Sequence, residues 1–397
     1  MGLKASKIIA DYTCGDLFGT SQVVIDDSEN DDNSTPPKNR IEFLIDSPGE
    51  TDFPKNPINL KPEIQKILSI NSDEGLFKYF VDGTRKTYKV SSIEYHKKVY
   101  PIIAGQIAVG CCERKNKNIC AVKYYHENLI SLPQIAYADF DETGKKRAGF
   151  FNEIKNQIND STLFKRMNIC IDHIIPYKQE KHVSQEIPYE NLGIAAIHEM
   201  MLDREKKIVN DLANENNLSC LENYLIKDGS IEYIDSKRGE FRDLGKIKNN
   251  YKRVVGVSKT FNPDQSSSGK KSNASMIAGL PEFYRTPAFK FYGTRSNSKT
   301  KTPLYFVAWY VRIRKYLGNN PFDGILKVEK LLLGDNPRDE YLDSQEIDMI
   351  SANLILERLP TSFGKEGRWA NHLYPVYLTE KFIKNIQIND YVFTNLF

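Results

Sequence analysis

Apolar residues cluster along the first third of the chain in a pattern that predicts strands. Residues 76–90 (LFKYFVDGTRKTYKV) combine an apolar and aromatic run with Asp-Gly, which predicts a strand that reaches Asp82 and turns at Gly83. Two later apolar runs, IIAGQIAVGCCER and ICAVKYYHENLISL, predict two more strands. Three strands separated by turn signals suggest an antiparallel meander.

The segment from Ile194 to Asn216 contains no Pro or Gly and has the clearest helical periodicity in the sequence. Its apolar residues fall on one helical face: Ile194, Ile197, Met201, Ile208 and Leu212.

Glu205 lies in the middle of this apolar stripe, whereas Glu199 lies on the opposite, solvent side. A carboxylate on a packed face is costly unless it is paired or binds a cation. The alternatives are a buried salt bridge or a stripe that opens to solvent there. His198 lies beside the stripe, where a hydrogen-bonded core histidine is the ordinary interpretation.

The remaining pattern mixes strands and helices, so the predicted class is α/β, a mixed sheet flanked by helices. It predicts helices at Pro62 to Ile70, in EIDMISANLILERL and near NHLYPVYLTEKFIKNIQI, and strands in YLIKDGSIEYI, RVVGVSKTF and PLYFVAWYVRIRKY. The acidic, proline-containing stretch Ile25 to Arg40 predicts a loop. We expect an N-terminal segment over residues 1–70 with this loop, and one functional domain over 71–397.

The amino-acid composition and the absence of known motifs exclude several classes of protein. The chain has 55 Lys and Arg against 52 Asp and Glu, a net charge of +3, which excludes a uniformly basic nucleic-acid binder. It has no apolar window of about eighteen residues and no secretory signal, so we expect a cytoplasmic protein with no membrane segment. Zinc, P-loop, serine-hydrolase and dinucleotide-binding motifs do not occur.

Two aspartates have similar flanking sequences. Asp82 in FVDGT and Asp228 in LIKDGS each follow an apolar run and precede glycine. Taken singly, each Asp-Gly is a turn signal. Together with the helical Glu205, however, they would form an all-oxygen site suited to Mg²⁺ or Mn²⁺. The order of strand carboxylate, meander, helix carboxylate and strand carboxylate is compatible with a ribonuclease-H-like core.

At this point the chain resembles a known family, the NurA-like nucleases. The resemblance rests on FVDGT, DREKKIVNDLANE, LIKDGSI, VVGVSKT and LYPVYL in this order, and covers about three quarters of the chain. It implies a ribonuclease-H-like fold with insertions and Mn²⁺ or Mg²⁺ as cofactor, with two ions expected. It also implies cleavage of single-stranded DNA and duplex ends, action with a hexameric HerA-type ATPase, and a homodimer.

The resemblance also implies roles for individual residues. Asp82, Glu205 and Asp228 would be metal ligands, and Lys259 would lie near the scissile phosphate, although a solvated lysine at a strand end is the alternative. The family usually places a histidine or aspartate after the Tyr-Pro pair, where this chain has EKFIK. His372 or Glu380 would have to replace it.

Positive charge is concentrated in one part of the sequence. Residues 227–330 contain 21 Lys and Arg against 9 Asp and Glu, a surplus of twelve, with aromatic residues interleaved. Such segments contact phosphates and stack on unpaired bases, although a solvated basic face is the alternative for each residue. The candidates for phosphate contact are Arg285, Lys290, Arg295, Arg312 and Arg314.

Three functions compete on these observations. The first is a metal-dependent DNA nuclease that acts with a HerA-like translocase in end resection or defence against phage DNA. The second is a catalytically inactive ribonuclease-H-like module that clamps DNA or scaffolds an ATPase ring, which the altered C-terminal position favours. The third is a guide-dependent Piwi-like protein, for which the chain is short.

Overall fold

The computed structural model describes most of the chain. The described residues are 3–19, 23–27, 47–70, 75–137, 149–178, 188–218, 223–231, 244–263, 267–268, 271–292, 305–315, 320–334, 340–360 and 367–397.

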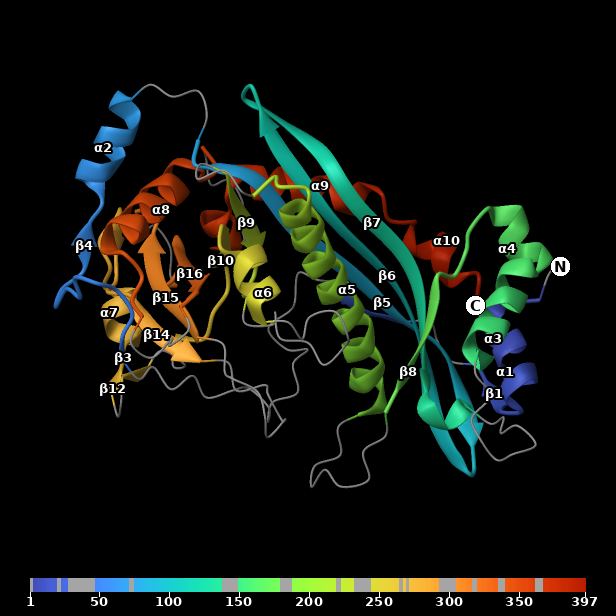
Figure 1. The fold of residues 1–397 in the computed structure, drawn as a ribbon. Helices are drawn as coiled ribbons and strands as arrows, with labels where there is room; N and C mark the ends of the chain where they lie inside the picture. Colours follow the sequence, from blue (N-terminus) through green and yellow to red (C-terminus); the bar gives the residue numbers. More distant parts are fainter. Residues whose placement is uncertain are drawn as a thin grey trace.

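A fourteen-stranded sheet forms the centre of the molecule, with its main strands in the order β3-β14-β15-β16-β10-β9-β5-β6-β7-β8 (Figure 1). Its strands are β1 (Asp16–Phe18), β2 (Val23–Asp27), β3 (Ser47–Pro48), β4 (Ile58–Asn59), β5 (Phe77–Tyr95), β6 (Lys98–Lys115), β7 (Asn118–Pro133), β8 (His173–Tyr177), β9 (Tyr224–Asp228), β10 (Val254–Ser258), β13 (Tyr284–Arg285), β14 (Phe289–Tyr292), β15 (Tyr305–Arg312) and β16 (Ile325–Leu331). In a separate two-stranded sheet, β11 (Ser267–Ser268) pairs antiparallel with β12 (Lys271–Ser272).

The sheet is mixed. Strands β5, β6 and β7 form the expected antiparallel meander, whereas β9 runs parallel to β5 and β10 runs parallel to β9. The predicted α/β class, a mixed sheet flanked by helices, is therefore confirmed. The order of elements is also the one expected of a ribonuclease-H-like core, since a meander and a long helix precede the parallel strand β9.

Helices cover both faces of the long strands. Helix α5 packs on one face of β5 and β6, and helix α9 packs on the other (Figure 1). The helices are α1 (Ala5–Thr13), α2 (Lys61–Ser69), α3 (Phe150–Asp160), α4 (Thr162–Met167), α5 (Tyr189–Asn214), α6 (Leu244–Tyr251), α7 (Ala274–Ala278), α8 (Ser344–Leu356), α9 (Tyr374–Asn385) and α10 (Asp390–Thr394). The long helix, the Pro62 helix and the two late helices are thus confirmed.

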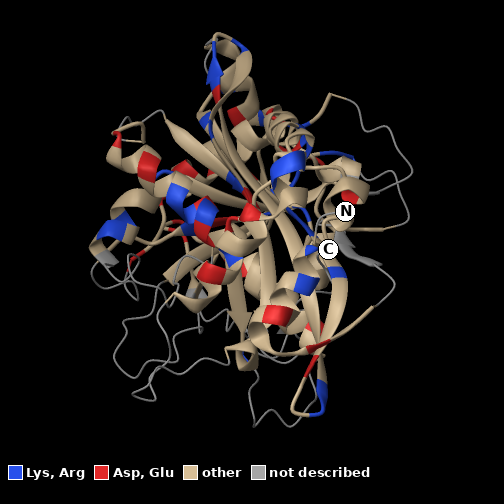
Figure 2. Ribbon diagram, turned by 90° about the vertical axis from the view of Figure 1, so that its right-hand side faces the viewer, with Lys and Arg blue, Asp and Glu red and all other residues tan. Residues whose placement is uncertain are grey.

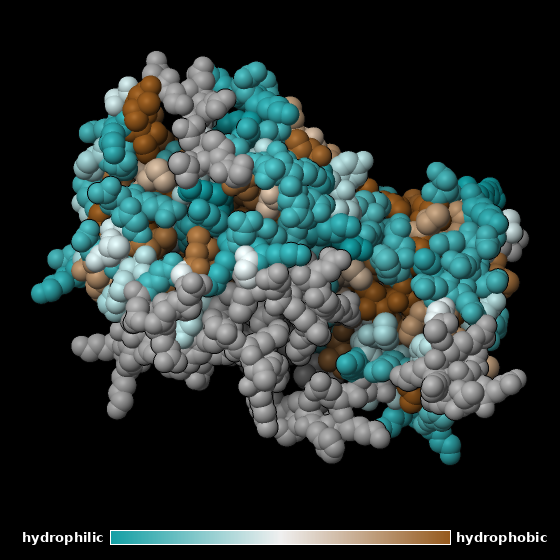
Figure 3. Space-filling model, in the orientation of Figure 1, coloured by the Kyte–Doolittle hydropathy of each residue, from teal (hydrophilic) through white to brown (hydrophobic). Residues whose placement is uncertain are grey.

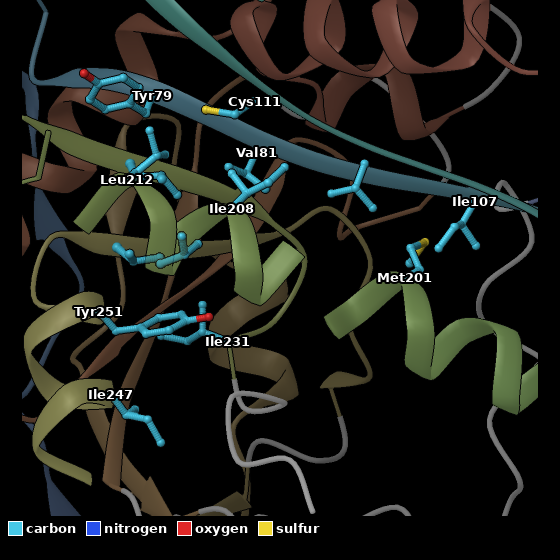
Figure 4. Packing of buried hydrophobic residues seen from close by; sticks show 14 of the residues in the cluster. Tyr79, Val81, Ile107, Cys111, Met201, Ile208, Leu212, Ile231, Ile247 and Tyr251 are labelled. Carbon is cyan, nitrogen blue, oxygen red and sulfur yellow. The ribbon is translucent and has the colours of Figure 1, made fainter. Parts of the chain in front are cut away.

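Neighbouring residues of a strand pack into different hydrophobic clusters, on opposite faces of the sheet. Tyr79 and Val81 of β5 belong to one buried cluster with Leu212 of α5 (Figure 4), on what we call the α5 face. Phe80, between them, packs with Val376 of α9 in a second cluster, on the α9 face. Because side chains alternate in a strand, each face of the sheet collects every second residue.

The turn predicted at Gly83 is wrong. Strand β5 continues without interruption from Phe77 to Tyr95, and Asp82 and Gly83 pair with Gly110 and Val109 of β6. Asp-Gly is a turn signal only where the chain reverses, and glycine within a strand instead marks a close approach by a neighbouring group.

The first seventy residues contribute to the same sheet as the rest. Strands β1 and β2 pair with β5, β3 pairs with β14, and β4 pairs with β13. The centre of the acidic stretch, around Asp31, lies outside the described residues. No helix in the described part of the chain is long and apolar enough to cross a membrane. The visible described surface is mostly hydrophilic with scattered apolar side chains (Figure 3).

Candidate active site

Asp82 and Asp228 lie next to each other on adjacent parallel strands. The register of β5 and β9 pairs Val81 with Lys227, so the two aspartates are the next residues along each strand. Asp82 is 5% exposed, and the Asp228 side chain is 20% exposed. Gly229, with φ of +81°, turns the chain just after β9. The structure therefore places these two carboxylates side by side.

A buried lysine lies between carboxylates on the α9 face. Nζ of Lys259, the residue that follows β10, is 3.0 Å from Oδ2 of Asp228 and 3.4 Å from Oε2 of Glu380. Glu380 projects from α9, and its other oxygen, Oε1, is 3.0 Å from Nζ of Lys384. The alternative of a solvated strand-end lysine does not hold, because the Lys259 side chain is only 8% exposed.

The pKa values reflect an excess of negative charge around this lysine. Burial and then the charge of Asp228 raise the pKa of Asp82 well above its usual range, against the opposing effect of Lys259. Burial would lower the pKa of Lys259, but the charges of Asp228, Asp82 and Glu380 raise it overall. Burial likewise opposes the ionised form of Glu380, yet Lys259 and Lys384 lower its pKa to about 2.

Glu205 lies on the α5 face, as its position in the apolar stripe predicted, and is 3% exposed. Its Oε2 is 2.8 Å from Nζ of Lys227, so a buried ion pair satisfies its charge. Burial raises the pKa of Glu205, and Lys227 opposes that shift. Since Lys227 and Asp228 are consecutive in β9, they point to opposite faces, and Glu205 is separated from the aspartate pair by the sheet.

Two glycines allow the helices to approach the sheet here. A Cβ on Gly83 would lie 2.6 Å from Oε1 of Glu205, on the α5 face. A Cβ on Gly110, the partner of Asp82 on β6, would lie 2.5 Å from Cγ2 of Ile383 in α9. The glycine after Asp82 therefore makes room for Glu205.

His372 lies just before α9, with its side chain 11% exposed. Its Nδ1 is 3.9 Å from Oε2 of Glu380, and its ring packs against those of Trp369 and Tyr377. Of the two residues considered as the C-terminal replacement, Glu380 is the one that contacts Lys259.

The donor chemistry of the α9 face suits a hard divalent cation. Asp82, Asp228 and Glu380 offer carboxylate oxygens, the donors that Mg²⁺ and Mn²⁺ prefer. Within the described ranges, however, no three His, Cys, Asp or Glu side chains are grouped as closely as a metal ion requires. The Lys259 ammonium lies among these carboxylates instead.

The basic residues predicted to contact phosphate have other roles. Arg285 is 1% exposed and paired with Glu50 and Asp348, while Lys290 is 3% exposed and lies over the ring of Tyr341. This burial corrects the prediction for both residues, because a side chain inside the protein cannot reach a phosphate outside it.

Arg312, 2% exposed, requires the same correction, since it donates hydrogen bonds to the carbonyls of Asp323, Ala278 and Pro321. Half-buried Arg314 donates to the carbonyls of Ala370 and Leu359. Arg295 lies outside the described residues. In the view of Figure 2, basic and acidic segments are interspersed over the described elements.

Sequence reasoning missed Lys227 as the partner of Glu205. The signal was available, since Lys227 stands one residue before Asp228 in an apolar strand and must therefore point to the opposite face. For Glu380, which helix α9 contributes to the site, the sequence contained only a weak signal. That signal was the position of Glu380 after the Tyr-Pro pair.

Comparisons with known proteins give a limited result. No protein-family model and no curated protein matches the chain. The crystal structure of the NurA nuclease from Sulfolobus solfataricus is similar over 85% of this chain and 92% of that one, at 9% identity and a TM-score of 0.34. With a TM-score this low, the similarity does not by itself assign a family or an activity.

Proposed function

We propose that this protein is a metal-dependent nuclease that hydrolyses phosphodiester bonds in DNA. The observation that carries the proposal is the pair Asp82 and Asp228, side by side on parallel strands and accompanied by Glu380 around the buried Lys259. Three carboxylates beside two ammonium groups, those of Lys259 and Lys384, leave negative charge that a divalent cation would neutralise.

The residues of the candidate site would have different roles in the reaction. The carboxylates of Asp82 and Asp228 would hold Mn²⁺ or Mg²⁺, and rigid strands would keep them in place. A bound divalent ion supplies activation of a water and neutralisation of charge on the leaving oxygen. Lys259, once released from its carboxylate partners, would offer a positive charge to the phosphate.

The experiment is a digestion of labelled single-stranded, blunt duplex and plasmid DNA with Mn²⁺ or Mg²⁺. We expect cleavage by the wild type, and loss of it in Asp82→Ala and Asp228→Ala with DNA binding and the folded state retained. Unchanged cleavage in both variants would exclude this site as the reaction centre. EDTA should abolish activity, and added metal should restore it.

A HerA-type hexameric ATPase as partner, a homodimeric state, and a role in end resection or antiviral defence belong to the same proposal. They rest on the sequence resemblance alone. Repeating the digestion with and without the ATPase, and measuring mass in solution, tests them separately from cleavage. A stimulation of duplex digestion that requires ATP hydrolysis is the expected result.

One observation favours a second function, an inactive module that clamps DNA or scaffolds an ATPase. Lysines already neutralise carboxylates on both faces, because Lys259 contacts Asp228 and Glu380, and Lys227 contacts Glu205. If no metal or partner condition gives cleavage while DNA binding persists, this function replaces the first.

A further inference from the structure

The sheet divides the acidic residues of the candidate site into two groups. Asp82 and Asp228 project to the α9 face, whereas Glu205 projects from α5 onto the opposite face, beside Gly83 and Lys227. The main chain of β5 and β9 lies between the groups. A ligand set that combined all three would therefore have to reach around the end of β9.

The α5 group is balanced. One buried carboxylate, Glu205, meets one buried ammonium, Lys227, at 2.8 Å, and Lys227 also donates to the carbonyl of Asp228. A buried carboxylate with an ammonium this close already has a compensating positive charge.

The α9 group is unbalanced. Lys259 is shared between Asp228 and Glu380. Its positive charge also opposes the upward shift in the pKa of Asp82. Nζ of Lys384 is 3.0 Å from the other oxygen of Glu380, Oε1. The buried Lys259 ammonium marks a position where a positive charge is held among these carboxylates.

We propose that Glu380, and not Glu205, completes the divalent-cation site with Asp82 and Asp228, and that Lys259 is the internal cation of the metal-free protein. The inference rests on the proposed function, which it deepens by assigning the ligands. Lys259 has a flexible four-carbon stem, so its ammonium can leave the carboxylates when an ion of higher charge binds. Glu205 and Lys227 then remain a structural pair that fixes α5 on the sheet.

The test is Mn²⁺ affinity in the absence of nucleic acid, measured from the electron paramagnetic resonance signal of free Mn²⁺. Glu380→Gln and Asp228→Asn should each weaken binding by about tenfold or more, whereas Glu205→Gln should change it by less than about threefold. Glu346→Gln is the matched control, because Glu346 also pairs with a buried lysine, Lys330 at 3.3 Å, outside both groups. Circular dichroism and the Tm of each variant verify the fold.

A second variant tests the role of Lys259. Lys259→Met removes the internal cation, so the metal-free protein should have a lower Tm, and added Mn²⁺ should raise the Tm more than in the wild type. A weaker response to Mn²⁺ than in the wild type would overturn the assignment of Lys259 as a competitor of the metal.

The remaining outcomes separate this inference from the proposed function. If Glu205→Gln loses Mn²⁺ affinity while Glu380→Gln keeps it, the ligand assignment is overturned even if the protein cuts DNA. If the wild type binds no Mn²⁺, the inference is overturned, and the digestion decides the activity by itself. If the affinities follow the expected pattern but DNA stays intact, the inference stands and the nuclease proposal fails.

Discussion

The two faces of the central sheet carry the same kinds of charge in different proportions. On the α5 face, Glu205 and Lys227 form a one-to-one buried pair. On the α9 face, Lys259 lies between Asp228 and Glu380, and Asp82 lies beside Asp228 on the neighbouring strand. Adjacent residues of β9 supply both faces and each covering helix adds one carboxylate, so the difference arises from Asp82 of β5 and from Lys259 after β10. A balanced pair serves the fold, whereas an excess of carboxylates is what a cation site requires.

The largest effect should come from removing a carboxylate on the α9 face. Asp228→Asn should lower metal-dependent cleavage roughly a hundredfold or more, because several kcal/mol of charge stabilisation would be lost. The measurement is the initial rate on labelled single-stranded DNA. Asp211→Asn is a suitable control, since Asp211 pairs with Lys123 and belongs to neither group. Equal rates for the two variants would remove the distinction between the faces.

On the α5 face, the largest effect should be on stability. Lys227→Met would leave the buried Glu205 without its partner, and we expect a loss of about 3–5 kcal/mol in the free energy of unfolding. Urea denaturation without divalent ions measures it.

The double variant Glu205→Gln/Lys227→Met sharpens this test. It replaces both charges, so most of the lost stability should return. A single Lys227→Met variant as stable as the wild type would show that Glu205 is not held by this pair.

The two glycines beside the site provide a matched pair of substitutions. Gly83→Ala would force apart Glu205 and β5, and Gly110→Ala would force apart Ile383 and β6. Each should cost about 1–3 kcal/mol of stability through overpacking. Only Gly110→Ala, which displaces the helix that carries Glu380, should also weaken Mn²⁺ binding. The reverse pattern would assign the metal to the α5 face.

The smallest effect should appear in the pH dependence of stability. Asp82 has a pKa raised by burial and by the charge of Asp228, so the folded protein holds this proton more tightly than the unfolded chain. Its contribution to stability is full below the usual pKa of an aspartate and is lost as the pH rises through the raised value. In Asp82→Asn the loss between about pH 4 and neutral pH should be smaller.

Unfolding by urea at several pH values, without metal, measures that difference. Glu205→Gln is the comparison on the other face, because Lys227 limits the upward shift of the Glu205 pKa. It should alter the pH dependence less than Asp82→Asn does. An identical pH dependence in Asp82→Asn and the wild type would contradict an excess of negative charge on the α9 face.

Local periodicity predicted much of the fold. The apolar stripe of the long helix placed Glu205 on its buried side, and the runs around Asp82 and Asp228 became neighbouring strands. These features depend on residues close in sequence, whose side-chain direction follows from the helical or strand repeat.

Features that depend on distant contacts were not predictable in the same way. The Asp-Gly at Asp82 suggested a turn, but the glycine accommodates Glu205 from a helix more than a hundred residues later. A count of basic residues could not reveal that Arg285 and Arg312 are buried inside the protein. Nor does a local pattern tell which face of the sheet a helical carboxylate meets.

The most direct measurement is the position of Mn²⁺ by anomalous X-ray scattering from crystals of the wild-type protein soaked in Mn²⁺. The expected result is a peak on the α9 face, within coordination distance of Asp82, Asp228 and Glu380, with the Lys259 ammonium moved away. A peak beside Glu205 on the α5 face, or no peak at a Mn²⁺ concentration that supports cleavage, would contradict it.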